Sequence, residues 1–222
     1  MNPFDAEREE ICRVGRSLFE RGYVHATAGN ISVRLPDGQG FLITPTDACL
    51  GTLAPDRLAA VAPDGTPRSG DRASKTLALH RRIYAADPAA NGVVHSHSTH
   101  LVALTLAGVW RPDAILPPIT PYQVMKVGRV PLVAYHRPGH GAVGDRVAHE
   151  IGSARERGSP IRAVMLDRLG PMVWHDTLAG AMAALEELEQ TARLWLLTAP
   201  RRPAPLGEAQ LDELRQAFGA HW

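Results

Sequence analysis

The chain has 222 residues, of which 45% are hydrophobic and 21% charged, with 24 basic and 23 acidic side chains. The hydrophobic content allows a sizeable core, and we expect residues 1–222 to form a single domain. A formal net charge of +1 gives no overall attraction to nucleic acid or to an anionic membrane, so neither is an expected partner.

The N-terminal segment argues against a targeting signal. Its first ten residues are acidic where a signal peptide is basic and then apolar, and no apolar run is long enough to span a bilayer. The only cysteines, Cys12 and Cys49, lie in ordinary segments, which argues against a disulfide scaffold. We therefore expect a cytoplasmic protein.

The first half of the chain alternates between helical and extended patterns. Ile11, Val14, Leu18 and Phe19 form the apolar side of an amphipathic helix that Gly22 ends. Alternating residues on both sides of a Pro-Asp-Gly turn at 36–38 predict a hairpin. The expected elements are a helix at 5–21, strands at 29–35, 40–44 and 58–62, a helix at 74–86 capped by Ser74, a strand at 93–97 and a helix at 98–107.

The second half begins with an irregular segment at 112–121 and ends in two helices. The expected elements are a strand at 130–135, a helix at 144–157, a strand pair at 161–166 and 171–174, a long helix at 177–197, a linker at 200–205 and a final helix at 207–218. Helices interleaved with hairpin-joined strands predict an α/β fold. We expect a layered α/β/α sandwich with a central, mostly antiparallel or mixed sheet and no Rossmann signature.

Two histidines, His95 and His97, follow the apolar pair Val93 and Val94. Alternate residues of a strand point to the same side, so the two imidazoles project together if the strand continues to His97. Two ligands at this spacing can bind one divalent ion such as zinc. The alternative is that two polar residues simply close a strand, and the neighbouring segments decide between these interpretations.

Four further segments could contribute to a site. Thr27-Ala-Gly-Asn-Ile-Ser32 places a glycine and small polar side chains at a turn, where backbone N–H groups can hold an anion. Thr44-Pro-Thr-Asp47 adds hydroxyls, and Ser74-Lys75 opens a helix whose N-terminus favours phosphate. Tyr122 could donate a proton from a loop. Each segment also has a structural interpretation: a turn, a loop, a helix cap with a solvated lysine, and a packing residue.

Taken together and in this order, these segments resemble the class II aldolase/adducin family of metal-dependent sugar-phosphate aldolases and epimerases. The closest resemblance is to its branch of 3-oxo-tetronate 4-phosphate decarboxylases. It runs from about residue 8 to residue 214 and is carried by Thr27-Ala-Gly-Asn-Ile-Ser32, Leu42-Ile-Thr-Pro-Thr46, Ser74-Lys75 before His80, Val93-Val-His-Ser-His-Ser98, Ile119-Thr-Pro-Tyr122 and the segments 130–139 and 185–192.

The resemblance implies roles for several side chains. His95 and His97 would be two of three histidine ligands of a catalytic divalent ion, with zinc the expected metal. Tyr122 would donate a proton in the site of a neighbouring subunit, within a homotetramer that has its sites at subunit interfaces. The phosphate of a small-molecule substrate would lie among five small or polar residues, Thr27, Gly29, Asn30, Thr46 and Ser74.

Three positions depart from the family pattern. Thr76 stands where the family has a catalytic glutamate, and a threonine hydroxyl cannot act as a general base near neutral pH. Leu169 stands where the third histidine ligand is expected. Asp47 replaces a glycine of the phosphate loop, where its carboxylate would repel a phosphate. The candidates to complete the metal shell are His25, His136, His140 and, if the alignment slips locally, Asp167.

We therefore expect a metal-dependent carbon–carbon lyase of carbohydrate metabolism, a decarboxylase or aldolase. It would act on a keto-sugar acid or related small polyol through a metal-stabilised enediolate. Decarboxylation needs no base to remove a hydroxyl proton, so it tolerates Thr76 better than retro-aldol cleavage does. Tyr122, Lys75 and His140 are the expected catalytic residues. Two alternatives stay open, namely a repurposed enzyme of specialised metabolism, with or without a metal, and a non-catalytic, adducin-like binding protein.

Overall fold

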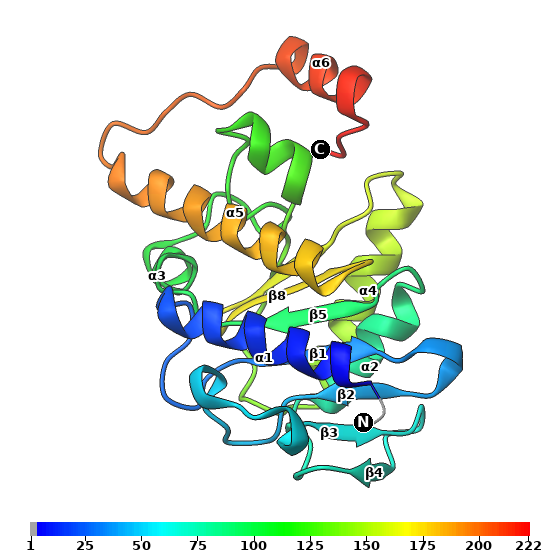
Figure 1. The fold of residues 1–222 in the computed structure, drawn as a ribbon. Helices are drawn as coiled ribbons and strands as arrows, with labels where there is room; N and C mark the ends of the chain where they lie inside the picture. Colours follow the sequence, from blue (N-terminus) through cyan, green and yellow to red (C-terminus); the bar gives the residue numbers. More distant parts are fainter. Residues whose placement is uncertain (1–3) are drawn as a thin grey trace.

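A computed structural model describes residues 4–222 of the chain (Figure 1). These residues contain one eight-stranded sheet with the order β4-β3-β2-β1-β5-β8-β7-β6. Neighbouring strands are antiparallel except β6 and β7, which run parallel. The predicted α/β fold with a mostly antiparallel, mixed sheet is therefore confirmed.

The helices and strands follow the predicted order closely. No helix within the described residues is long and apolar enough to cross a membrane. The strands are β1 (Asn30–Arg34), β2 (Phe41–Ile43), β3 (Ala59–Val61), β4 (Pro67–Ser69), β5 (Gly92–His95), β6 (Leu132–Val133), β7 (Ala163–Leu166) and β8 (Gly170–His175). The helices are α1 (Asp5–Glu20), α2 (Leu77–Ala86), α3 (Thr99–Ala107), α4 (Ala142–Glu156), α5 (Leu178–Leu197) and α6 (Glu208–Phe218), with short helical segments η1 (Pro36–Gly38), η2 (Leu50–Thr52), η3 (Pro55–Arg57) and η4 (Gln123–Val127).

Helices cover both faces of the sheet, and alternate residues of the central strands point to opposite faces. On one face, Val94 and Val173 belong to a core that includes residues of α1, α3 and α5. On the other face, Val93 and Trp174 belong to a core that includes residues of α2 and α4. Figure 1 shows α1 and α5 lying across the near side of the sheet. These two layers explain why the central strands are apolar on both sides.

Helix α1 follows the predicted amphipathic pattern with one exception. Ile11, Val14 and Leu18 are buried, as the helical spacing predicts. Phe19 is instead 40% exposed. Its ring covers Gly51, where an added Cβ would lie 2.6 Å from ring atoms of Phe19. The aromatic side chain therefore packs on the η2 loop beside the helix, and its assignment to the buried face was wrong.

Helix α2 begins later than predicted because the segment before it pairs with a distant loop. The backbone N–H of Ser74 donates to Thr44 O over 3.1 Å, and Ala73 forms a β-bridge with Pro45. This pairing holds residues 73 and 74 out of the helix, which starts at Leu77. Ser74 still accepts the N–H of Thr76 through its hydroxyl, over 3.3 Å.

Two elements were not predicted, and two predicted strands are shorter in the structure. Strand β4 was missed, since all three of its residues are exposed and show no alternation. The strand expected at 130–135 is shortened to Leu132–Val133. The π-helical segment Gln123–Val127 was not predicted. Strand β5 ends at His95 instead of continuing to residue 97.

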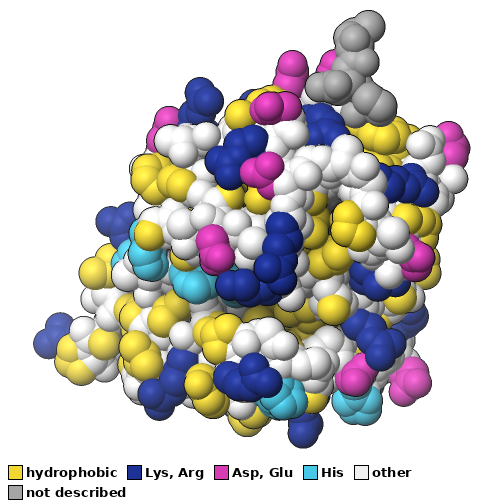
Figure 2. Space-filling view, turned by 90° about the horizontal axis from the view of Figure 1, so that it is seen from below, with side chains coloured by type: hydrophobic (Ala, Val, Ile, Leu, Met, Phe, Trp, Pro, Cys, Tyr) yellow, Lys and Arg dark blue, Asp and Glu magenta, His cyan; other side chains and the backbone are white. Residues whose placement is uncertain are grey.

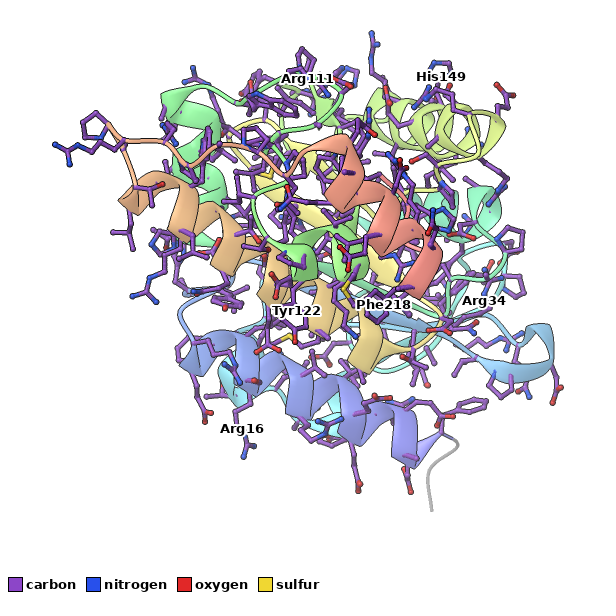
Figure 3. The ribbon with its side chains drawn as sticks, turned by 90° about the horizontal axis from the view of Figure 1, so that it is seen from above. Arg16, Arg34, Arg111, Tyr122, His149 and Phe218 are labelled. Carbon is purple, nitrogen blue, oxygen red and sulfur yellow. The ribbon has the colours of Figure 1, made fainter. Side chains whose placement is uncertain are left out.

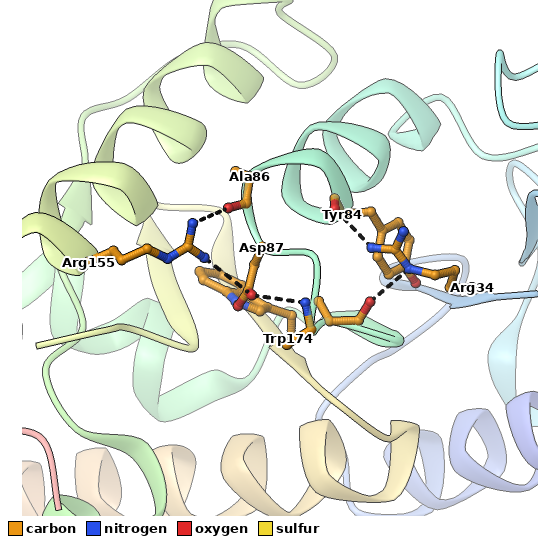
Figure 4. Close-up of polar contacts among 8 residues, drawn as sticks. Arg34, Tyr84, Ala86, Asp87, Arg155 and Trp174 are labelled. Atoms are coloured by element: carbon orange, nitrogen blue, oxygen red, sulfur yellow. Dashed lines mark hydrogen bonds and ion pairs between the residues drawn. The ribbon is translucent and has the colours of Figure 1, made fainter. Parts of the chain in front are cut away.

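Polar contacts surround the connection from α2 to β5 (Figure 4). The indole N–H of Trp174 donates to Asp87 Oδ2 over 3.0 Å, and Arg155 of α4 donates to Asp87 Oδ1 over 3.4 Å. Arg34 of β1 donates to the carbonyl of Tyr84 over 2.9 Å. These contacts join α2, α4, β1 and β8 around the connection that leads into β5.

Candidate functional site

One cavity of about 1080 Å³ gathers most of the predicted site residues. Its walls come from the turn before β1, the loop after β2, the start of α2, the loop after β6 and the ends of β5 and β8. Figure 2 shows histidine side chains beside Lys and Arg side chains on the face seen from below. The predicted residues that line the cavity are Thr27, Gly29, Asn30, Thr46, Ser74, Lys75, His95, His97 and His140.

His95 and His97 lie together although the strand ends at His95. Their ring centroids are 5.0 Å apart. The Nδ1–H of His95 donates to Pro171 O over 2.9 Å, so the lone pair of the neutral ring is on Nε2. Burial, with a smaller effect of His97, lowers the pKa of His95 to about 4. Burial and the neighbouring His25 also lower the pKa of His97. Both imidazoles are therefore neutral near pH 7 and able to act as ligands.

Two side chains flank this pair. The ring of His25 lies 6.3 Å from that of His97, nearly perpendicular to it. Leu169 lines the cavity beside the pair. Its neighbour Gly170 fits so closely that a Cβ there would lie 2.0 Å from Ser96 O and 3.3 Å from the Cα of His97. The β5–β8 register thus brings Leu169, and not Asp167, into the cavity wall.

The donor set fits part of a metal shell. Neutral imidazoles with a fixed tautomer are common metal ligands, and the hydrogen bond from His95 to a carbonyl is the usual support for such a ligand. Within residues 4–222, no group of three His, Cys, Asp or Glu side chains is arranged to hold a metal ion. The pair of His95 and His97 could therefore supply two ligands, and His25, whose ring lies 6.3 Å from that of His97, is a candidate for a third.

Next to the histidine pair lie the residues expected around an anion, and their part of the cavity is here called the anion side. Gly29 has φ +83°, and a Cβ there would lie 2.6 Å from Val24 Cγ1 and 2.9 Å from His95 O. The residue must therefore be glycine for both conformational and steric reasons. Asn30 follows it and pairs across the strands with His95. The backbone register thus joins the anion side of the cavity to the histidine pair.

Asp47 does not stand alone in the loop after β2. The backbone at Asp47 is left-handed, with φ +58°. Glycine adopts this conformation without strain, which accounts for the glycine of the family pattern at this position. Lys75 Nζ lies 3.4 Å from Asp47 Oδ2, and both side chains are exposed. The hydroxyl of Thr76 lies 2.9 Å from that of Ser74. The carboxylate that was expected to repel an anion is therefore next to a compensating positive charge.

The two histidines of the loop before α4 differ in position. His140 lines the cavity, and its Nδ1 accepts the N–H of Ala142 over 3.2 Å at the start of the helix. The ring of His136 lies 5.3 Å from that of His140 but does not line the cavity. His136 donates from Nδ1 to Ala134 O over 2.7 Å. Of the two, His140 is the one placed to reach a bound molecule.

Tyr122 lies outside this cavity. It is 61% exposed and lines a separate, smaller cavity beside α5 that includes Tyr23 and Glu187. Figure 3 shows Tyr122 well apart from Arg34, which lines the large cavity. Within one subunit, Tyr122 is therefore not placed to act on a molecule bound near His95.

The sequence reasoning missed the basic residues of the cavity. Four arginines line it from β1, α2 and the loop before α4, and no local pattern distinguishes them from solvated side chains. It also missed the burial of His80 and Tyr84, although both lie on the buried face of α2 with Ile83. The helical spacing of these three residues could have revealed that face. The four arginines are Arg34, Arg81, Arg82 and Arg137.

Comparisons with known proteins agree with this geometry. The model of the class II aldolase and adducin N-terminal domain matches residues 9–196. The chain is 56% identical over 220 residues to a 3-oxo-tetronate 4-phosphate decarboxylase of Cupriavidus necator, covering 97% of each chain. It is 41% identical to the protein of that name from Escherichia coli K12, covering 94% of each. The crystal structure of YgbL from Escherichia coli, described with aldolase, epimerase and decarboxylase as candidate activities, has a TM-score of 0.85 and 40% identity and covers 95% of this chain and 98% of its own.

Proposed function

This chain belongs to the class II aldolase and adducin family, and on that premise we propose that it decarboxylates 3-oxo-tetronate 4-phosphate. The observation that carries the proposal is the 56% identity to a decarboxylase of that name over 97% of both chains. The cavity supports it by joining an anion side to a pair of neutral histidines. The sequence-based expectation of a carbon–carbon lyase is confirmed by this similarity.

The chemistry of this substrate explains why Thr76 can replace a carboxylate. The keto group at C3 is β to the carboxylate at C1, so the C1–C2 bond can break with its electron pair passing to the C3 oxygen. Carbon dioxide leaves, and C2 then takes up one proton to give a three-carbon hydroxyketone phosphate. No step removes a proton from the substrate, so a general base at position 76 is not required.

Charge complementarity supports binding of such a substrate. The molecule carries a carboxylate and a phosphate, and Lys75 and Arg137 approach the cavity from different loops. Five basic side chains and one acidic side chain, Asp47, line the cavity, and such an excess of positive charge attracts an anionic ligand. We propose that the phosphate lies among the residues already described on the anion side, Thr27, Gly29, Asn30, Thr46 and Ser74.

We propose that His95 and His97 hold a divalent ion, with zinc the expected metal, and that His25 is the nearest residue able to join them. Members of this family are typically metal-dependent. A bound ion would supply Lewis-acid stabilisation of the charge that develops on the keto oxygen. His95 contributes a ring whose orientation is fixed by its bond to Pro171 O. Leu169 contributes an apolar side chain to the cavity wall.

The proton taken up at C2 needs a donor, and two residues are proposed for it. His140 lines the cavity of its own subunit. Tyr122 is exposed and lies outside that cavity, so it would act in the site of a neighbouring subunit of a homotetramer. A Tyr122→Phe variant mixed with a His95→Ala variant distinguishes the two, because hybrid tetramers recover activity only if the sites contain residues of different subunits.

The proposed activity is tested by comparing substrates. The purified protein should release carbon dioxide from 3-oxo-tetronate 4-phosphate at least about a hundredfold faster than from the unphosphorylated acid, since several charge-assisted hydrogen bonds are lost with the phosphate. A control without protein gives the spontaneous rate of this β-keto acid. A His95→Ala variant should have lost both turnover and metal, measured by elemental analysis. Equal rates with and without protein would refute the proposal.

A further inference from the structure

A chain of buried polar side chains ends at the cavity. The hydroxyl of Tyr84 lies 2.8 Å from Ser32 Oγ, which lies 2.7 Å from Nδ1 of His80. Nε2 of His80 lies 2.5 Å from Oδ1 of Asn30. Ser32 and His80 are fully buried, and Asn30 lines the cavity. Four side chains from β1 and α2 thus form one hydrogen-bonded chain beside the cavity, which Tyr84 also lines.

The hydrogen bonds of this chain have one consistent direction. An amide oxygen only accepts, so Nε2 of His80 carries the ring hydrogen at its contact with Asn30 Oδ1. Nδ1 is then an acceptor, so Ser32 uses its single hydrogen to donate to Nδ1 of His80 and accepts from the Tyr84 hydroxyl. Burial lowers the pKa of His80 to about 3, so its neutral ring has one N–H. That N–H is on Nε2 and donates to Asn30 Oδ1.

The reverse direction places two acceptors against each other. It would put the ring hydrogen of His80 on Nδ1, donating to Ser32, whose hydroxyl would then donate to Tyr84. Nε2 would then present a lone pair to Asn30 Oδ1, 2.5 Å away, and an amide oxygen has no hydrogen to donate. The direction from Tyr84 to Asn30 is therefore the one that fits the contact between His80 and Asn30.

We propose that His80 is a positioning residue for the anionic group of the substrate. By donating to Asn30 Oδ1, it holds the amide with its NH₂ group towards the cavity, where that group donates to a phosphate. An amide turned the other way would present its oxygen and repel the anion. The two orientations of a carboxamide have the same shape, so only a fixed donor such as His80 can choose between them. The arrangement exists before the substrate binds and needs no reorganisation.

The tautomer of His80 is the first test. The tautomer assignment depends only on the hydrogen-bond geometry, so its outcome does not depend on whether the protein is a decarboxylase. Long-range ¹H–¹⁵N NMR spectra of the full-length protein labelled at histidine distinguish a ring protonated at Nε2 from one protonated at Nδ1. The His80 signals are assigned by their loss in a His80→Gln variant. We expect the Nε2–H tautomer, and the Nδ1–H tautomer would overturn the proposal.

The second test measures anion binding directly, with inorganic phosphate as the probe. His80→Leu removes the donor and should weaken phosphate binding about tenfold, the loss expected for one hydrogen bond to a charged group. His80→Gln keeps an N–H that can reach Asn30 and should retain most of the affinity. Trp174→Phe removes a partly buried hydrogen bond to Asp87 outside the cavity and serves as the structural control, with phosphate affinity unchanged.

The kinetic constants of the His80→Leu variant distinguish the positioning role of His80 from the proposed decarboxylase activity. If the chain is a decarboxylase, His80→Leu should raise KM for the phosphorylated substrate about as much as it weakens phosphate binding, and change kcat by less than about threefold. If the chain has no such activity, the phosphate affinities still decide the question. A folded His80→Leu variant that binds phosphate as tightly as the parent would overturn the proposal. If that variant does not fold, His80→Gln and the tautomer of the parent decide it.

Discussion

Asn30 of β1 and His95 of β5 are direct partners across an antiparallel strand pair. One register therefore places the anion side of the cavity next to the histidine pair. Because side chains alternate between the faces of a sheet, a slip of one residue would move both away from the cavity. A change in the turn before β1 should consequently disturb anion binding and the histidine pair together.

Gly29→Ala tests this coupling. The backbone at Gly29 is left-handed, and the new Cβ would lie 2.9 Å from His95 O. We expect the free energy of unfolding to fall by about 1 to 3 kcal/mol, with loss of phosphate binding. Gly22→Ala is the matched control, since Gly22 has φ +72° but no heavy atom within 4 Å of its added Cβ. Chemical denaturation should show a clearly larger loss for Gly29→Ala, and equal losses would contradict the steric argument.

Thr76→Glu introduces the carboxylate that this chain lacks. Thr76 lines the cavity, so the new charge would face a substrate that already carries a carboxylate and a phosphate. We expect kcat/KM for the phosphorylated keto acid to fall at least about tenfold, because two like charges at short distance cost more than 1 kcal/mol. Thr76→Gln has nearly the same shape without the charge and should lose much less. Similar losses in the two variants would show that size, and not charge, matters at this position.

Leu169→His should complete the metal shell. Leu169 lines the cavity beside His97, so an imidazole there would add a third nitrogen near the existing pair. We expect the affinity for zinc or cobalt to increase at least about tenfold, since each added ligand contributes more than 1 kcal/mol. The visible absorption of bound cobalt reports the change in coordination directly. Leu169→Gln, which is polar but a poor ligand, should bind the ion as the parent does.

The metal-free protein should lose stability in acid. Burial lowers the pKa of His80 to about 3 and that of His95 to about 4, below the usual histidine value of 6.5. The unfolded chain therefore binds these protons first, so the stabilising effect of the neutral rings is complete above about pH 6.5 and is lost as pH falls towards 4 and then 3. The neutral ring of His80 contributes on the order of 5 kcal/mol and that of His95 on the order of 3 kcal/mol.

Denaturation measured from pH 7 to pH 4 checks this dependence. The free energy of unfolding should decrease steadily over the range, and His80→Gln should flatten the decrease. His149→Gln, on the exposed surface of α4 (Figure 3), should leave the slope unchanged. A parent protein whose stability does not change between pH 6.5 and pH 4 would contradict the burial of neutral histidines.

Much of the architecture could be predicted from local patterns. The alternation of Val93 and Val94 between two apolar layers, and the cap of α5 at Thr177, depend on nearby residues only. The gathering of Thr27, Asn30 and Ser74 with the histidine pair could be expected only from the resemblance to a family, because they are distant in sequence.

Other features depend on contacts between distant residues. The late start of α2 results from the pairing of Ser74 with Thr44, and no helical pattern contains that information. The approach of His25 to His97 and the donor direction of His80 likewise become visible only when α2, β1 and the turn before β1 are in place. The charge of Asp47 was judged alone, whereas the structure places Lys75 beside it.

The most direct test of the proposed decarboxylation follows the carboxyl carbon itself. The protein is incubated in deuterated water with 3-oxo-tetronate 4-phosphate that carries ¹³C at C1, beside a control without protein. We expect labelled carbon dioxide to form faster than in the control, with one deuterium entering the phosphorylated product at the former C2 in each turnover. Retention of the label in an organic product, or release no faster than the spontaneous rate, would contradict the account.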